Sequence, residues 1–210
     1  MELEEKEKQR SLKIMINQQD SAPVIEDLAK LGITVEWISD LNKNLNNHIK
    51  AIPILLKWLP LIDNLDVKES IVRTLSIPST KPIAAPALIK EFRKFRNLPD
   101  SGIAWVIGNA LSVVADDSVA VDIIELVQDL HYGKSRQMLV IALGNMRKVD
   151  VQDVLINLLN DEFVFGHAII ALGKIKSKKA YEILSEYEHY PVAWVRKEAK
   201  KARGRIRTKQ

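Results

Sequence analysis

An apolar pattern recurs along this chain at intervals of about 30 residues. Its clearest copies are AIPILLKWL at residues 51–59 and AAPALIKEF at residues 84–92, in which Ala, Pro, Leu and Lys recur at one offset of 33 residues. Within each copy an apolar triplet is spaced i, i+1, i+4, which places its side chains on one face of a helix. A period of this length predicts an array of repeated helical units. The triplets begin at Leu55, Leu88, Ile123, Val154 and Ile183.

A second series alternates with the first and ends in small residues. It includes Ala110-Leu111-Ser112, Ala142-Leu143-Gly144 and Ala171-Leu172-Gly173. Each unit is therefore predicted to contain two antiparallel helices, A then B, with the small residue marking the end of helix A or a close approach of two backbones. One such pair cannot bury its own apolar face, so neighbouring pairs are expected to stack into a right-handed superhelix.

The predicted fold is all-α: a right-handed α-solenoid of about five antiparallel helix pairs with an N-terminal helical cap. In the cap, Asp20 or Ser21 is expected to begin a helix that has Pro23 in its first turn and ends at Gly32. Few Gly and Pro residues and an aromatic content of 6% also favour helices. The expected divisions are a helical arm at 1–20, a solenoid at 21–207 with a degenerate first repeat at 35–61 and clear repeats at 66–207, and a basic tail end at 208–210.

Two segments resemble HEAT-like repeats: FVFGHAIIALGKIKSKKAYEILSEYE and AWVRKEAKKARGRI. They are similar to the short repeats of the phycobilisome-lyase type, in which Val-Arg opens helix A and Ala-Leu-Gly-x-Ile closes it. The resemblance covers residues 66–207. It implies a concave face lined by B helices, where extended partners usually bind. It does not imply one activity, because such repeats serve scaffolds, inhibitors and a few enzymes.

Composition and motifs exclude several kinds of site. The chain has no Cys, which excludes disulfides, Cys-ligated metals and a thiol nucleophile. Its four His residues share no i, i+4 spacing, and the sequence contains no HExxH, GxSxG, GxxxxGK[ST] or GxGxxG. No catalytic, cofactor-binding or metal site is predicted. These observations favour a protein that is not an enzyme.

Charge is unevenly distributed. The chain carries a net charge of +4, but residues 196–210 hold eight basic residues and one acidic residue, so the preceding part is weakly acidic. A polar outer face on the terminal helix explains these charges, and contact with RNA, DNA, anionic lipid or an acidic protein is the alternative. The N-terminus has no apolar signal segment, and no uncharged apolar run approaches a membrane-spanning length. A cytoplasmic protein is expected.

Polar residues of the predicted B helices form the candidate partner-binding surface. The helix at 84–92 presents basic residues and the next one acidic residues, so the groove is expected to change sign along its length. A nucleic-acid groove would keep one sign, so a charge-patterned protein or peptide fits better; plain solvated faces are the alternative. Trp58 is expected to be partly exposed, as a binding anchor or a cover over the first repeat. The candidate residues are Trp58, Lys90, Arg93, Lys94, Asp122, Glu125 and Asp129.

Basic residues follow the start of several A helices at Lys68, Arg136 and Arg196. In repeats of the resembled type, such residues pair with acidic residues of the adjacent repeat, and Asp161 lies in an inter-repeat turn. The resemblance therefore implies an inter-repeat charge ladder, and binding of a phosphate or carboxylate ligand is the alternative. Trp194, near the start of a predicted A helix, is expected to pack between adjacent repeats.

The leading interpretation is a non-enzymatic scaffold that binds a protein or peptide in a concave groove. One alternative is an enzyme that resembles bilin lyases or isomerases, but the low aromatic content disfavours a tetrapyrrole groove. Another is a HEAT-like nucleic-acid-binding protein, in which the basic C-terminal residues would make the contact. The expected change of sign along the groove opposes that reading.

Overall fold

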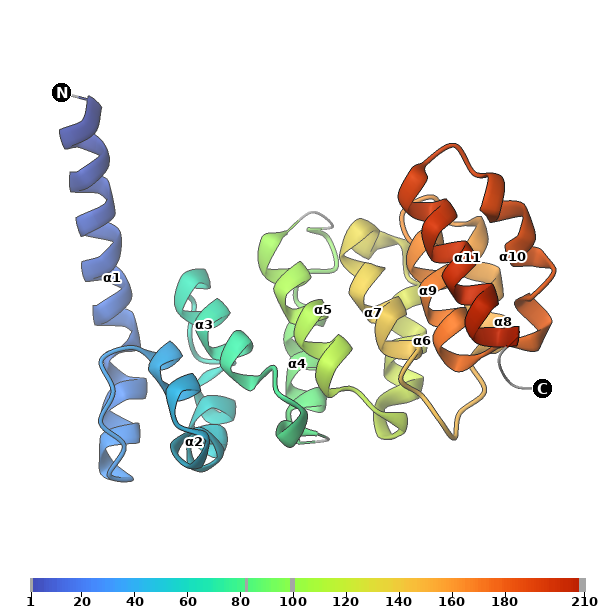
Figure 1. Cartoon of the computed structure of the whole chain (residues 1–210). Helices are drawn as coiled ribbons and strands as arrows, with labels where there is room; N and C mark the ends of the chain where they lie inside the picture. The colour runs from blue at the N-terminus through green and yellow to red at the C-terminus, as the bar shows by residue number, and fades with distance from the viewer. Residues whose placement is uncertain (1, 82, 99–100, 208–210) are drawn as a thin grey trace. The chain divides into compact units, whose positions relative to one another are not determined.

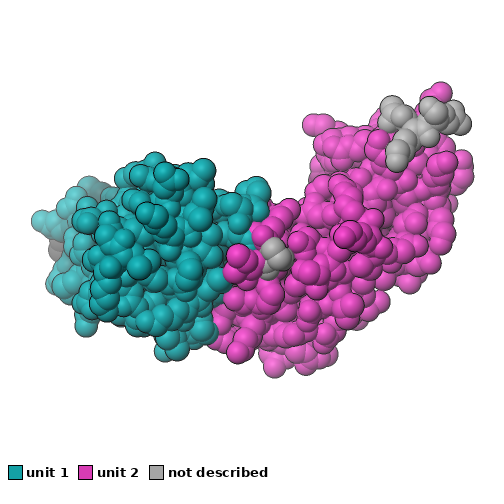
Figure 2. All heavy atoms as spheres, turned by 90° about the horizontal axis from the view of Figure 1, so that it is seen from below, with its two compact units in different colours: residues 1–80 teal, residues 81–210 magenta. Residues whose placement is uncertain are grey.

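A computed structural model describes residues 2–81, 83–98 and 101–207 (Figure 1). These residues form α-helices and 3-10 helices and no strand, so the all-α prediction is confirmed. The chain divides into two compact units, which Figure 2 distinguishes by colour. Unit 1 comprises residues 1–80 and unit 2 comprises residues 81–210.

Unit 1 begins with one long helix, α1. The predicted helix start at Asp20 or Ser21 is wrong, because α1 continues through both residues and Pro23 lies inside it. The predicted end at Gly32 is confirmed: Gly32 has φ +74° and donates to the carbonyl of Ala29, and Ile33 donates to that of Leu28. The helices of unit 1 are α1 (Glu2–Lys30), η1 (Ile38–Lys43), α2 (Leu45–Trp58), α3 (Leu65–Leu75) and η2 (Pro78–Thr80).

Unit 2 consists of alternating A and B helices with apolar faces turned inward. The A helices α5, α7, α9 and α11 pack on one another in that order, and the B helices pack beside them. The helices are α4 (Ala84–Arg93), α5 (Gly102–Val114), η3 (Asp117–Val119), α6 (Ala120–Gln128), η4 (Leu130–Arg136), α7 (Gln137–Leu143), α8 (Gln152–Asn157), η5 (Leu158–Asn160), α9 (Phe165–Ile175), η6 (Lys178–Ala180), α10 (Ile183–Glu186), η7 (Tyr187–His189) and α11 (Ala193–Arg207).

The A helices of unit 2 run parallel to one another. At the beginning of α9, Gly166 lies under the ring of Trp194, and near its end Gly173 lies against Ala202. Both contacts join corresponding turns of α9 and α11, as only a parallel pair allows. Trp194 therefore packs between adjacent repeats, as predicted, although it stays partly exposed.

This parallel stacking gives unit 2 two edges. We call the edge at which α5, α7, α9 and α11 begin the start edge, and the edge at which they end the end edge. Figure 1 shows the α5–α6 and α7–α8 turns together at the lower side of unit 2, and the turn before α11 at the upper side. Turns of one kind, from B to A or from A to B, therefore gather on one edge.

Candidate functional site

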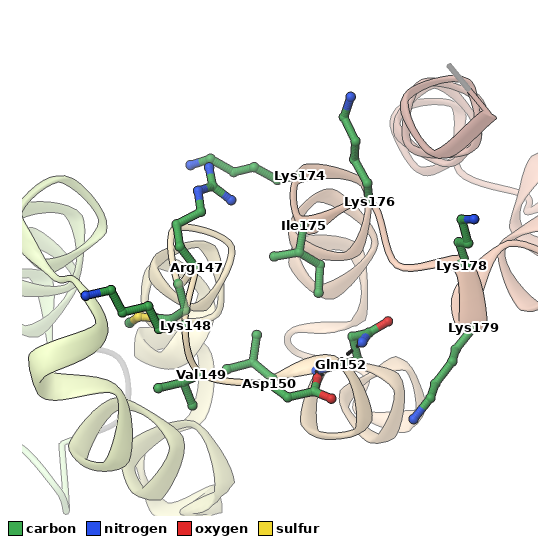
Figure 3. A pocket seen from close by; sticks show the side chains of 12 residues that line it. Arg147, Lys148, Val149, Asp150, Gln152, Lys174, Ile175, Lys176, Lys178 and Lys179 are labelled. Carbon is green, nitrogen blue, oxygen red and sulfur yellow. Dashed lines mark hydrogen bonds between the residues drawn. The ribbon is translucent and has the colours of Figure 1, made fainter. Parts of the chain in front are cut away.

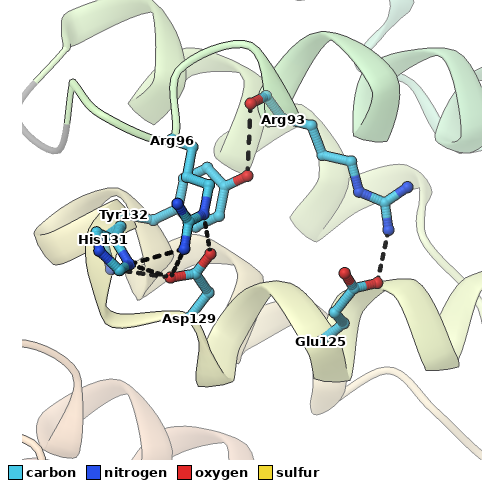
Figure 4. A network of polar contacts seen from close by, with 6 residues as sticks. All are labelled: Arg93, Arg96, Glu125, Asp129, His131 and Tyr132. Atoms are coloured by element: carbon cyan, nitrogen blue, oxygen red, sulfur yellow. Dashed lines mark hydrogen bonds and ion pairs between the residues drawn. The ribbon is translucent and has the colours of Figure 1, made fainter.

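The charges predicted to line a groove pair with one another between α4 and α6 (Figure 4). Arg93 on α4 places Nη2 2.8 Å from a carboxylate oxygen of both Asp122 and Glu125 on α6. One turn further, Arg96 places Nε 2.6 Å from Oδ2 of Asp129. Because these side chains are partly exposed, each pair stabilises the packing of the two helices by at most about 1 kcal/mol. The basic charge of α4 thus neutralises much of the acidic charge of α6.

The remaining predicted partner-binding residues do not form one site. Lys94 pairs with the buried Glu91 at 2.6 Å, and Lys90 is exposed on α4. Trp58 belongs to unit 1, where Nε1 donates to Oδ2 of Asp27 at 2.9 Å. Its indole therefore fixes α2 against α1.

Asp129 gives the network a pH dependence that can be measured. Loss of hydration acts to raise the pKa of the Asp129 carboxyl, but hydrogen bonds from Arg96 and His131 outweigh it and lower that pKa from 3.8 to about 2. A lowered folded-state pKa means that the contribution to stability is present above pH 3.8 and is lost as the pH falls through 2.

We expect Asp129→Asn to lower the free energy of unfolding by less than about 1 kcal/mol at neutral pH. The difference from the wild type should stay constant from pH 7 to about 5 and then shrink as the pH falls to about 2, because the Asp129 carboxyl is protonated first in the unfolded chain and then in the folded chain. Urea unfolding of both proteins across this pH range measures the difference in their free energies of unfolding. A difference that stayed constant with pH would show that the Asp129 charge is not its source.

The basic residues predicted as a charge ladder differ in their surroundings. Arg136, at the end of η4, is fully buried and places Nη1 2.6 Å from Oδ2 of Asp161 in the next repeat. Arg196 departs from the prediction, because it donates Nη1 to the carbonyl oxygens of Tyr190 and Pro191, just before its own helix. Lys68 is buried in α3 of unit 1.

The start edge of unit 2 presents a large apolar side chain in each B-to-A turn. Leu130 and Phe163, in successive turns, are 69% and 41% exposed. Between them lies a hollow of about 470 Å³ with Val127, Val154 and Leu158 in its walls. Sequence reasoning missed this surface, because it compared helix faces and not the turns. The exposed apolar residues of these turns are Leu98, Leu130, Phe163 and Val192.

The end edge carries a hollow of about 910 Å³ between two A-to-B turns (Figure 3). It is formed by the turn after α7 and by the last turn of α9 with the segment that follows. Figure 3 shows cationic side chains around its margin and Ile175 between them. The sequence contains a signal for this site, since basic residues follow Gly144 and Gly173, the small residues of α7 and α9, within five positions. Its cations are Arg147, Lys148, Lys174, Lys176, Lys178 and Lys179.

Two further limits apply to the residues that the structure describes. Within residues 2–81, 83–98 and 101–207, no cluster of His, Asp or Glu side chains has an arrangement suited to a metal ion. No helix in that part of the chain combines the length and apolar character required to cross a membrane.

Comparison with known proteins supports the repeat architecture. The family model for HEAT repeats matches residues 109–204, which span α6 to α10, the C-terminal part of α5 and most of α11. No curated protein and no solved structure gives a significant match to the chain. The match agrees with the stacked helix pairs of unit 2 and does not distinguish the phycobilisome-lyase type. HEAT repeats are therefore identified over residues 109–204, within unit 2.

Proposed function

We propose that the chain is a non-enzymatic interaction module and that the start edge of unit 2 binds a segment of a partner protein. HEAT repeats commonly act as protein-interaction scaffolds, since stacked repeats present extended surfaces. The observation that carries the proposal is the hollow between Leu130 and Phe163. Exposed apolar residues beside a hollow are typical of places where a partner inserts an anchoring side chain.

The chemistry of this hollow indicates what the partner segment contains. Its walls are apolar, whereas its margin includes the carboxylate of Glu162, the amides of Asn157 and Asn160 and the Arg136–Asp161 ion pair. An apolar side chain would fill the walls, and a neighbouring Lys or Arg would meet the acidic margin. We therefore expect a segment with an apolar anchor next to a basic residue.

Local bonds hold the start edge in place before any partner arrives. Gln137 at the beginning of α7 donates Nε2 to the carbonyl oxygen of Phe163 at 2.9 Å, and Asp161 accepts from the backbone N–H of Phe163 at 3.0 Å. A surface that is already ordered loses little conformational entropy on binding. This favours a rigid docking surface over a segment that folds around its partner.

A peptide-display selection on immobilised protein tests the proposal. We expect the selected peptides to carry apolar anchors next to Lys or Arg, and Phe163→Ser to weaken their binding about tenfold or more. Val121→Ser is the matched control, because Val121 is a 79% exposed apolar residue of α6 that does not line the hollow. Selection of no peptides, or equal loss in both variants, would contradict the proposal.

A further inference from the structure

The end edge of unit 2 concentrates positive charge in successive turns. Six cationic side chains and one carboxylate, that of Asp150, line the hollow there. Asp150 accepts from the backbone N–H and the side chain of Gln152, so its charge is directed at the start of α8. The last turn of α11 adds Arg205 and Arg207 at the end of the next A helix. Cations thus recur on this edge after α7 and α9 and at the end of α11, in three successive repeats.

Side chains of neighbouring repeats hold these turns in position. The carboxylate of Asp117, in the preceding A-to-B turn, accepts from the backbone N–H groups of Arg147, Lys148 and Val149 at 2.8–3.1 Å. The Lys148 bond, the largest contribution, and those of its neighbours lower the pKa of Asp117, so it stays an acceptor at neutral pH. The fold therefore uses one carboxylate to fix the backbone of the cationic turn.

A chain of amide and ammonium contacts joins three A helices beside the hollow. Lys174 of α9 donates Nζ to Oδ1 of Asn145, whose Nδ2 donates to the carbonyl oxygen of Ser112 on α5 at 2.7 Å. Burial lowers the pKa of the Lys174 ammonium, and the charges of Arg147, Lys81 and Arg205 lower it further. The cationic side chains of the end edge therefore repel one another. A bound anion would relieve that repulsion.

Lys176 adds an independent observation. It adopts the left-handed conformation, with φ 57° and ψ 45°, at the C-cap of α9. Glycine is the usual residue at such a position, because a side chain there costs on the order of 1 kcal/mol. A lysine at a position where the backbone favours glycine therefore suggests a role for its ammonium group.

We propose that the end edge of unit 2 binds the phosphodiester backbone of a nucleic acid. Six of the seven charged side chains at the hollow are cationic, and further cations follow in the last turn of α11, as binding to a chain of phosphates requires. Five of the six cations at the hollow are lysines, whose ammonium groups meet phosphate oxygens as point charges and do not require the fixed geometry of an arginine fork. The edge lies opposite the start edge, so this proposal stands independently of the partner-protein proposal.

Lys176 and Lys178 provide variants that preserve the fold. Within the part of the chain that the structure describes, neither side chain has an ion-pair partner, so their removal breaks no internal bond. Lys176→Gly also suits the left-handed backbone. We expect the urea unfolding midpoint of Lys176→Gly/Lys178→Gln to be close to that of the wild type. The matched control is Lys90→Gln/Lys134→Gln, which removes two exposed charges away from the hollow.

Fluorescence anisotropy with a labelled thymidine oligonucleotide of about 30 nucleotides tests the proposal at several salt concentrations. The wild type should bind with strong salt dependence. The Lys176→Gly/Lys178→Gln variant should bind about tenfold or more weakly and reduce the slope of log K against log salt by about 1.4, since each lost phosphate contact removes about 0.7. The control variant should change the affinity by less than about threefold.

Three outcomes would overturn the proposal. The first is no salt-dependent binding by the wild type. The second is equal loss in the control variant, or loss only in Lys197→Gln/Lys200→Gln, which would assign the affinity to the exposed face of α11. The third is that polyglutamate of equal charge, or vesicles rich in phosphatidylserine, bind to these lysines as tightly as the oligonucleotide does. That result would assign the edge to an acidic protein or a lipid surface instead.

Discussion

Replacing Arg136 by methionine should lower the free energy of unfolding by about 3–5 kcal/mol, the largest loss expected from any single change considered for this chain. The Arg136 side chain is fully buried and donates to Asp161 and to the carbonyl oxygens of Val127 and Gly133, at 2.6, 3.0 and 3.0 Å. Methionine preserves much of the volume but leaves a carboxylate and two carbonyls without these donors. Removal of one member of a buried pair costs far more than the pair itself contributes.

Urea unfolding followed by circular dichroism measures this effect, and Arg93→Met is the matched control. Arg93 also pairs with carboxylates of the next repeat, but it does so at the surface, so its replacement should cost less than about 1 kcal/mol. A double-mutant cycle of Arg136→Met with Asp161→Asn should give a coupling energy above about 1 kcal/mol. Equal losses for Arg136→Met and Arg93→Met would show that burial does not set the strength of these pairs.

The helical architecture could be predicted because its cause is local in the sequence. Apolar triplets at i, i+1, i+4 specify a helix face, and their recurrence specifies stacking. Small residues at the ends of A helices also carried correct information: Gly144 ends α7, and Gly173 lies against Ala202. Each of these features depends on residues within one repeat or at a fixed offset from it.

The continuity of α1 could not be predicted in the same way. Pro23 removes one backbone donor, and proline is typical of the first turn of a new helix. In the structure, Val24 and Leu28 are buried and Asp27 binds Lys57 and Trp58 of α2. Packing within unit 1 therefore holds the chain helical on both sides of the proline. Such tertiary contacts override a local signal for a helix start.

The candidate sites were harder to predict than the fold for a related reason. Each B helix, taken alone, presents charges to solvent, so α4 reads as basic and α6 as acidic. Stacking brings Arg93 beside Asp122 and Glu125, and the charges neutralise one another. The two hollows lie between turns of consecutive repeats, where residues such as Arg147 and Lys176 meet only after the helices stack. The pattern of one helix at a time does not predict that such residues are neighbours.

Gly173→Ala should also destabilise the protein, although alanine is the better helix former by about 1 kcal/mol. A Cβ added at Gly173 would lie 2.5 Å from Cβ and 2.6 Å from Cα of Ala202. Because one of these atoms is backbone, no side-chain rotation relieves the overlap, and α9 and α11 have to separate. Overpacking of this kind costs roughly 1–3 kcal/mol, and the added separation also weakens the burial of neighbouring apolar residues.

Gly204→Ala separates the gain in helix propensity from the cost of overpacking in the same pair of helices. No heavy atom lies within 4 Å of a Cβ at Gly204, which is inside α11, so this variant should match the wild type or exceed it by up to about 1 kcal/mol. Urea unfolding of both variants compares a glycine required for close packing with one that is not. Equal stabilisation by the two substitutions would mean that α9 and α11 do not approach closely at Gly173. In that case the stacking of the last two A helices, which places the cationic turns on one edge, would have to be revised.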